Sequence, residues 1–151
     1  MGFADDKAFG EAGESRALLY IDYDTYEAAP RRRFKDWDFF TVKNGKRTYW
    51  EAKTDRFTHR SGNIVIEFES SGEPSGIAAT KADKWIYLLD GEPTIFIIPT
   101  ADLKQMIEDN KYHSIRHIAE RGKNSAYFFD RTVFEDYEYE VDAKTLPAAK
   151  I

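Results

Sequence analysis

A short turn signal in the first third of the chain constrains the fold more than any other feature. The dipeptide Asn44-Gly45 lies between two runs rich in β-branched and aromatic residues, 38–42 and 48–55. Asn-Gly favours the two-residue turn that joins adjacent antiparallel strands. The sequence therefore predicts a β-hairpin, in which the start of the first run lies beside the middle of the second.

Three charged side chains occur within this predicted hairpin. Asp38 opens the first strand, and Glu51 and Lys53 lie inside the second. Because side chains alternate along a strand, Glu51 and Lys53 share one face, and Trp50 and Ala52 share the other. Two carboxylates and an ammonium on a rigid sheet suit Mg²⁺-assisted hydrolysis of a phosphodiester. The acids would hold the cation, and the lysine would orient the attacking water.

The context of this acid-any-lysine triplet carries the signal, because the bare triplet occurs five times in the chain. Four copies lie in terminal or polar segments, where solvated charge explains them. Only Glu51-Ala52-Lys53 falls in a β-branched and aromatic run, where an unpaired charge is costly.

The arrangement resembles the PD-(D/E)XK nucleases, the restriction-endonuclease-like superfamily, with Asp38 as the first acid and Glu51-Ala52-Lys53 as the second acid and lysine. The run 10–19 looks like the preceding helix of that family, which bears a further glutamate. Within the superfamily, the chain is most like the small phage and archaeal Holliday-junction resolvases. The run 75–85 looks like the second core helix of small phage-type members. Trp37 stands where the family has a proline before its first acid.

The resemblance implies a particular metal site. Asp38, Glu51 and the Ala52 carbonyl would ligate Mg²⁺, for which Mn²⁺ would substitute, and Lys53 would position the attacking water. Glu14 would support the water shell of the cation. The number of metal ions is left open.

Two of these assignments have rivals nearby in the sequence. Asp36 competes with Asp38, which is favoured because it directly enters the apolar strand, and Glu11 competes with Glu14.

The implied fold is α/β, with a restriction-endonuclease-like αβββαβ core in which helices flank a mixed central sheet. At 151 residues the chain is expected to form a single nuclease domain, 1–151. The elements expected along it are a helix over 7–20, strands over 21–29, 38–42, 48–55 and 63–70, a helix over 77–89, a strand over 94–99, a helix over 101–109, and strands over 124–129 and 134–141. Residues 58–62 are expected to form a polar loop, and residues 70–76 a turn-rich loop.

Charge is distributed unevenly along the chain. The net charge is −5, yet residues 31–60 carry ten basic and four acidic side chains, a net of +6. A local basic surface in an acidic protein can steer and hold phosphates. The side chains expected to contact nucleic acid are Arg31, Arg32, Arg33, Arg56, Arg60 and Lys81.

These features predict a Mg²⁺-dependent DNA endonuclease, selective for branched DNA such as four-way junctions. Two symmetric nicks require two sites, so a homodimer is expected. The chain lacks cysteine and any long apolar run, so a cytoplasmic protein without a membrane span is expected, in a bacterial or archaeal host if a phage encodes it. The alternatives are an exonuclease, repair or restriction-type nuclease, and a non-catalytic nucleic-acid-binding module on the same fold.

Overall fold

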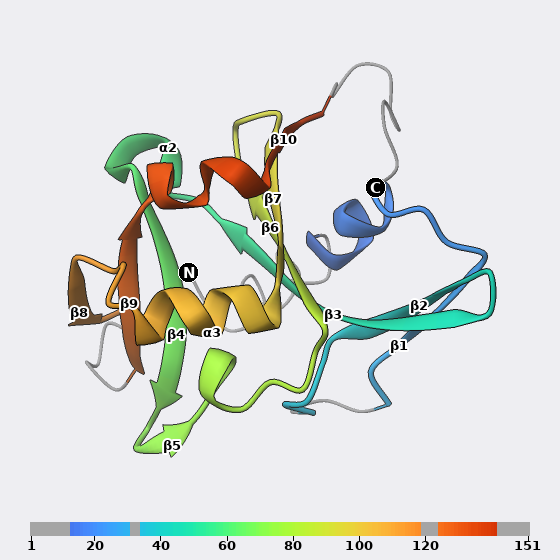
Figure 1. The fold of residues 1–151 in the computed structure, drawn as a ribbon, viewed down its shortest axis with the longest axis horizontal. Helices are drawn as coiled ribbons and strands as arrows, with labels where there is room; N and C mark the ends of the chain where they lie inside the picture. The colour runs from blue at the N-terminus through green and yellow to red at the C-terminus, as the bar shows by residue number, and fades with distance from the viewer. Residues whose placement is uncertain (1–12, 31–33, 119–123, 142–151) are drawn as a thin grey trace.

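The computed structural model describes residues 13–30, 34–118 and 124–141. Two β-sheets dominate this part of the chain, and its helices are few and short (Figure 1). Residues 13–18 are helical, and the other helices are α2 (Thr58–Ser61), α3 (Thr100–Glu108) and the 3₁₀ helices η1 (Gly76–Ala78) and η2 (Arg131–Tyr137). The strands are β1 (Thr25–Ala28), β2 (Phe39–Lys43), β3 (Lys46–Asp55), β4 (Asn63–Ser70), β5 (Glu73–Pro74), β6 (Lys84–Leu89), β7 (Thr94–Pro99), β8 (Ser114–His117), β9 (Asn124–Asp130) and β10 (Glu138–Glu140).

The larger sheet has six strands in the order β1-β2-β3-β6-β7-β10, and the smaller sheet has four in the order β5-β4-β9-β8. β3 and β6 pair in parallel, whereas the other neighbours in the larger sheet are antiparallel. The expected α/β class with a mixed sheet is therefore confirmed. The second sheet was not expected from the sequence.

The predicted hairpin is confirmed in detail. β2 and β3 are antiparallel, with Phe39 opposite Trp50 and Lys43 opposite Lys46. Asn44 and Gly45 have φ angles of 51° and 76°, the two positive values that this tight turn requires.

The helix predicted over residues 77–89 is wrong. Only Gly76–Ala78 is helical, as one 3₁₀ turn, and the second half of the segment is β6. Five consecutive buried residues, 85–89, form an apolar run that is covered on both faces, as strands that pair in parallel commonly are. Burial on both faces removes the alternation that marks a half-exposed strand, so no pattern opposed the helix that the resemblance implied for this segment.

Most other expected elements occur near their expected bounds. The strands over 63–70, 94–99 and 124–129 correspond to β4, β7 and β9, and the helix over 101–109 corresponds to α3. The strand over 21–29 is confined to β1, the loop over 58–62 contains α2, and 134–141 divides between η2 and β10. Part of the helix expected over 7–20 lies outside the described residues.

Two apolar clusters occupy the opposite faces of the larger sheet. One lies between the sheets and joins Trp85 and Phe96 of the larger sheet to Ile66 and Phe129 of the smaller. The other face is covered in part by the helical residues 13–18, whose Ala17 belongs to the second cluster. The alternation of β3 therefore directs Glu51 and Lys53 toward the smaller sheet. In the described ranges, no helix has the length and apolar character needed to cross a membrane.

The turn at Gly76 provides a test of this packing. Gly76 has a φ of 51°, and a Cβ there would lie 2.1 Å from the Glu67 carbonyl oxygen. Gly62 also has a positive φ, 70°, but nothing lies within 4 Å of its Cβ position. We expect Gly62→Ala to cost about 1 kcal/mol of unfolding free energy for the backbone conformation. We expect Gly76→Ala to cost a further ~1–3 kcal/mol, because the β4 backbone must move. Urea unfolding of the two variants measures the difference, and equal losses would contradict the close approach.

Candidate active site

Asp38 and Glu51 come together as the hairpin predicts. Asp38 immediately precedes β2, and its backbone N–H donates to the Trp50 carbonyl at 2.8 Å. Its carboxylate oxygen Oδ2 accepts the Ala52 N–H, also at 2.8 Å, so the side chain lies against β3. Asp38, Glu51 and Lys53 all line one cleft.

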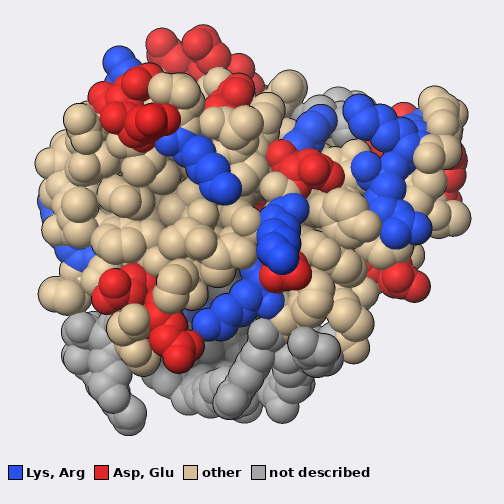
Figure 2. Space-filling view, turned by 60° about the horizontal axis from the view of Figure 1, so that its bottom comes forward, with Lys and Arg blue, Asp and Glu red and all other residues tan. Residues whose placement is uncertain are grey.

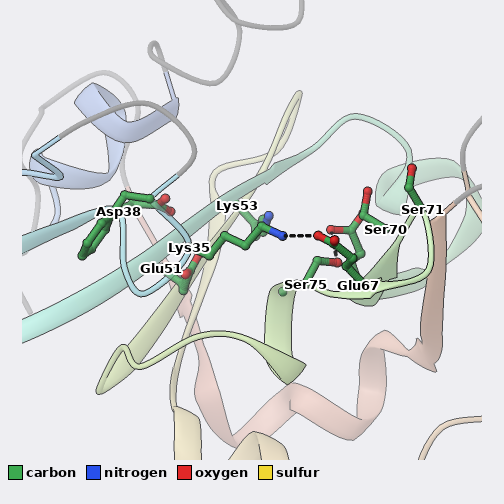
Figure 3. A pocket seen from close by; sticks show the side chains of 11 residues that line it. Lys35, Asp38, Glu51, Lys53, Glu67, Ser70, Ser71 and Ser75 are labelled. Carbon is green, nitrogen blue, oxygen red and sulfur yellow. Dashed lines mark hydrogen bonds and ion pairs between the residues drawn. The ribbon is translucent and has the colours of Figure 1, made fainter.

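The cleft has a volume of about 630 Å³ and lies between the two sheets (Figure 3). One wall comes from the hairpin and the segment before it, and the other comes from β4, β5 and the residues around them. The lining residues of the first wall are Phe34, Lys35, Asp38, Glu51 and Lys53, and those of the second are Glu67, Ser70, Ser71, Glu73, Ser75 and Gly76.

Glu51 is the least exposed acid of this group, with 7% of its surface accessible. Its pKa is raised to about 8, first by burial and then by the negative charge of Asp38, although the Lys53 ammonium and a hydrogen bond from Thr80 act in the opposite direction. The two carboxyl groups are close enough to hydrogen-bond to each other. In the absence of a cation the pair therefore tends to retain a proton near neutral pH.

Thr80 fixes the orientation of Glu51. Its hydroxyl lies 3.0 Å from Glu51 Oε1 and 3.2 Å from the Asp36 carbonyl oxygen, and it accepts the Ala82 N–H at 3.1 Å. The threonine is 6% exposed, and these three protein groups satisfy its buried hydroxyl. The sequence could not indicate this role, because Thr80 was expected in the first turn of the helix over 77–89.

The geometry distinguishes Asp38 from its rival Asp36. The Asp36 carboxylate lies 3.8 Å from the Lys81 ammonium, and Asp36 does not line the cleft. Its backbone carbonyl accepts the Lys81 N–H at 2.6 Å, which fixes this loop beside the site. Asp36 and Lys81 thus form a pair beside the cleft, whereas Asp38 lies in it with Glu51.

Glu67 is a cleft residue that the sequence did not single out for the site. Its two carboxylate oxygens accept hydrogen bonds from the Ser75 hydroxyl and from Asn124 Nδ2, each at 2.9 Å. Asn124 in turn accepts from the Ser70 hydroxyl at 2.8 Å. A β-bulge between Glu67 and Glu69 interrupts the pairing with β9 at this point. The second wall is therefore a hydrogen-bonded polar surface, whose residues are brought together by the pairing of β4, β5 and β9.

The remaining predicted site residues lie apart from the cleft or outside the described chain. Glu14 is half-buried in the helical segment 13–18, which packs on the opposite face of the larger sheet, and it does not line the cleft. Arg56 is half-buried after β3, and Arg60 in α2 has its guanidinium 5.3 Å from the centre of the Phe57 ring. Glu11 and Arg31–Arg33 lie outside the described residues.

The donor set of the cleft fits a small hard cation. Within the described ranges, no group of three or more His, Cys, Asp or Glu side chains is arranged to hold a metal ion. The site implied by the resemblance is smaller, with the carboxylates of Asp38 and Glu51 and the carbonyl of Ala52. Oxygen donors of this kind suit Mg²⁺, which keeps several of its waters when it binds protein. A cation between the two acids would also offset their mutual repulsion, which adds to burial in raising the pKa of Glu51.

Comparison of the chain with protein-family models, with curated proteins and with solved structures found no match in any of the three.

The raised pKa of Glu51 predicts a pH-dependent stability of the metal-free protein. Its ordinary value is 4.5, so the folded state binds this proton more tightly than the unfolded state. The resulting stabilisation is fully present below pH 4.5 and is lost as the pH rises to about 8. We expect the free energy of unfolding to fall across this window by up to about 1.4 kcal/mol per pH unit, and Glu51→Gln to abolish this fall.

Urea unfolding at several pH values, without divalent cations, measures this effect. Glu140→Gln removes an exposed acid from β10 and serves as the matched control. Parallel pH profiles for the wild type and Glu51→Gln would contradict the assignment.

Proposed function

We propose that this protein is a Mg²⁺-dependent DNA endonuclease of the PD-(D/E)XK type. The observation that carries the proposal is the convergence of Asp38, Glu51 and Lys53 in one cleft, with Glu51 buried against a second carboxylate. Buried charge on an interior strand costs free energy, and cation binding is a function that offsets this cost.

Each of the three side chains has a distinct task in the proposed reaction. Asp38 and Glu51, with the Ala52 carbonyl, would hold Mg²⁺, which when bound supplies an acidified water and neutralises charge on the phosphate. Lys53 shares the strand face of Glu51, so its ammonium is available to orient the attacking water toward the phosphorus. Thr80 and the Ala52 N–H hold the two carboxylates in place, which reduces the reorganisation needed during reaction.

The charge distribution supports an anionic polymer as the substrate. Figure 2 shows one face of the molecule, with Lys and Arg side chains over its right-hand part, where the β2–β3 hairpin lies. Further Lys and Arg side chains lie toward the centre of this face, between acidic side chains. Such a surface attracts phosphates in a salt-dependent manner. The acids of the cleft itself would repel a phosphate without a cation, so we expect the metal to be needed to place the scissile phosphate, whereas basic groups outside the cleft hold the rest of the DNA.

The resemblance to resolvases extends the proposal to branched DNA and to a homodimer. Four-way junctions need two symmetric nicks, and a two-fold dimer supplies two identical sites. Cleavage of linear, nicked, flap and four-way-junction DNA, together with sedimentation at assay concentration, tests this extension. A monomer that cuts linear duplex equally well would exclude the resolvase activity and leave the nuclease proposal intact.

Substitutions in the cleft test the chemistry. Because they remove a metal ligand or the water-orienting ammonium, we expect Asp38→Asn, Glu51→Gln and Lys53→Ala each to lower the cleavage rate by about 10³-fold or more. DNA binding should persist in each variant.

Asp36→Asn is the matched control, because Asp36 lies beside the site but outside the cleft; we expect it to retain near-normal cleavage. Loss of cleavage in Asp36→Asn with retention in Asp38→Asn would move the first acid to Asp36. Near-normal cleavage by Glu51→Gln or Lys53→Ala would exclude the proposed mechanism. Wild-type binding of DNA without cleavage in Mg²⁺ or Mn²⁺ would identify a non-catalytic module.

Metal binding can be measured independently of activity. A ligand that binds only the folded state raises the melting temperature as its concentration increases. We expect Mg²⁺ and Mn²⁺ to raise the melting temperature of the wild type, and to have a much smaller effect on Asp38→Asn and Glu51→Gln. Identical shifts in the wild type and both variants would place the cation elsewhere.

A further inference from the structure

An ion pair joins the two walls of the cleft. The Lys35 ammonium lies 3.6 Å from Glu73 Oε2, and both residues line the cleft. Lys35 belongs to the segment that leads to Asp38, whereas Glu73 belongs to β5 of the smaller sheet. Figure 3 shows the Lys35 side chain reaching across the cleft toward the wall that carries Glu67 and Ser75.

This ion pair is exposed and can be separated at little cost. The side chains of Lys35 and Glu73 have 50% and 76% of their surface accessible. Exposed pairs of this kind contribute little to stability, because water solvates the separated charges well. β5 is held independently, by its pairing with Glu69 and Ser70 of β4. The pair is therefore not needed to hold the hairpin in position.

The cations of the cleft occupy different depths. Among the described lining residues the cations are Lys35 and Lys53. Lys53 lies on β3 beside the buried Glu51, whereas Lys35 is half exposed at the rim. A nucleic-acid strand bound with one phosphate at Lys53 would leave the cleft past its rim, where Lys35 lies.

We infer that Lys35 binds a phosphodiester group of the substrate, and that Glu73 occupies the position of this group when the cleft is empty. The inference rests on the proposed nuclease function and adds a substrate-binding residue to it. A carboxylate and a phosphodiester each present charged oxygens to an ammonium, so Lys35 exchanges one anionic partner for another. Glu73 then turns toward solvent. Because Glu73 competes with phosphate for Lys35, it lowers the affinity for a single phosphate and favours substrates that engage several basic groups together.

The test measures DNA binding by fluorescence anisotropy, with Ca²⁺ in place of Mg²⁺ and at several salt concentrations. The variants are Lys35→Ala, Glu73→Gln and the double variant. Lys104→Ala removes an exposed lysine of α3, and Glu69→Gln removes an acid from the adjoining strand; neither residue lines the cleft. These two variants control for the change in net charge.

We expect Lys35→Ala to weaken binding about fivefold and to reduce the salt slope by about one, as the loss of one phosphate contact should. We expect Glu73→Gln to tighten binding about threefold, a change of the size that an exposed ion pair can produce. In the Lys35→Ala background, Glu73→Gln should have a smaller effect, because the pair that it disrupts is already absent.

The outcomes separate this inference from the proposed function. If the wild type binds DNA and Lys35→Ala matches Lys104→Ala in affinity and salt slope, Lys35 is not a phosphate ligand and the nuclease proposal stands. If Glu69→Gln tightens binding as much as Glu73→Gln, the effect is general repulsion and the role of Glu73 is excluded. If the wild type neither binds nor cleaves DNA at low salt, the proposed function and this inference both fail.

Discussion

The parallel pairing of β3 with β6 is the constraint on which the rest of the structure depends. Two parallel neighbours cannot be joined by a tight turn. Residues 56–83 must therefore leave the sheet where β3 ends and run back along it before β6 begins opposite Trp50. In this chain the connection contains β4 and β5, which belong to the second sheet, and two short helical segments, α2 and η1. Because β6 begins opposite Trp50, at the middle of β3, the connection returns at the level of Glu51, and it forms one wall of the cleft.

The same pairing explains why the acidic centre is buried. β3 lies between β2 and β6, and its two buried residues, Trp50 and Glu51, lie at its middle, where β6 begins to pair with it. Glu51 is opposite Trp85 and Lys53 is opposite Tyr87, both of which belong to the core between the sheets. A carboxyl group in such surroundings keeps its proton unless a nearby positive charge stabilises the carboxylate. The burial of Glu51 thus couples the protonation of this side chain to the stability of the fold.

Local signals predicted the hairpin half of the site, and long-range pairing determined the other half. The Asn44-Gly45 turn and the alternation along β3 were sufficient to place Asp38 beside Glu51, because hairpin register follows from the turn. The strand β4 was also found with its correct bounds. The helix expected over 77–89 was wrong because the buried run of β6 has no alternation. Glu67 and Glu73 line the cleft, and Thr80 contacts Glu51, only because of the path that the chain takes between the parallel strands β3 and β6, which no local pattern indicates.

The hydroxyl of Tyr87 has a mechanical consequence for this cleft. It accepts the Val65 N–H of the smaller sheet at 3.2 Å and donates to Asp55 of the larger sheet at 2.5 Å. Asp55 also accepts the N–H groups of Phe57 and Thr58, so the sheets are fastened where β3 ends. At the rim they are linked by the solvent-exposed pair of Lys35 and Glu73. The two walls of the cleft are therefore joined by hydrogen bonds of low exposure at the Tyr87 end and by an ion pair that water solvates well at the rim, so the rim is the weaker of the two connections.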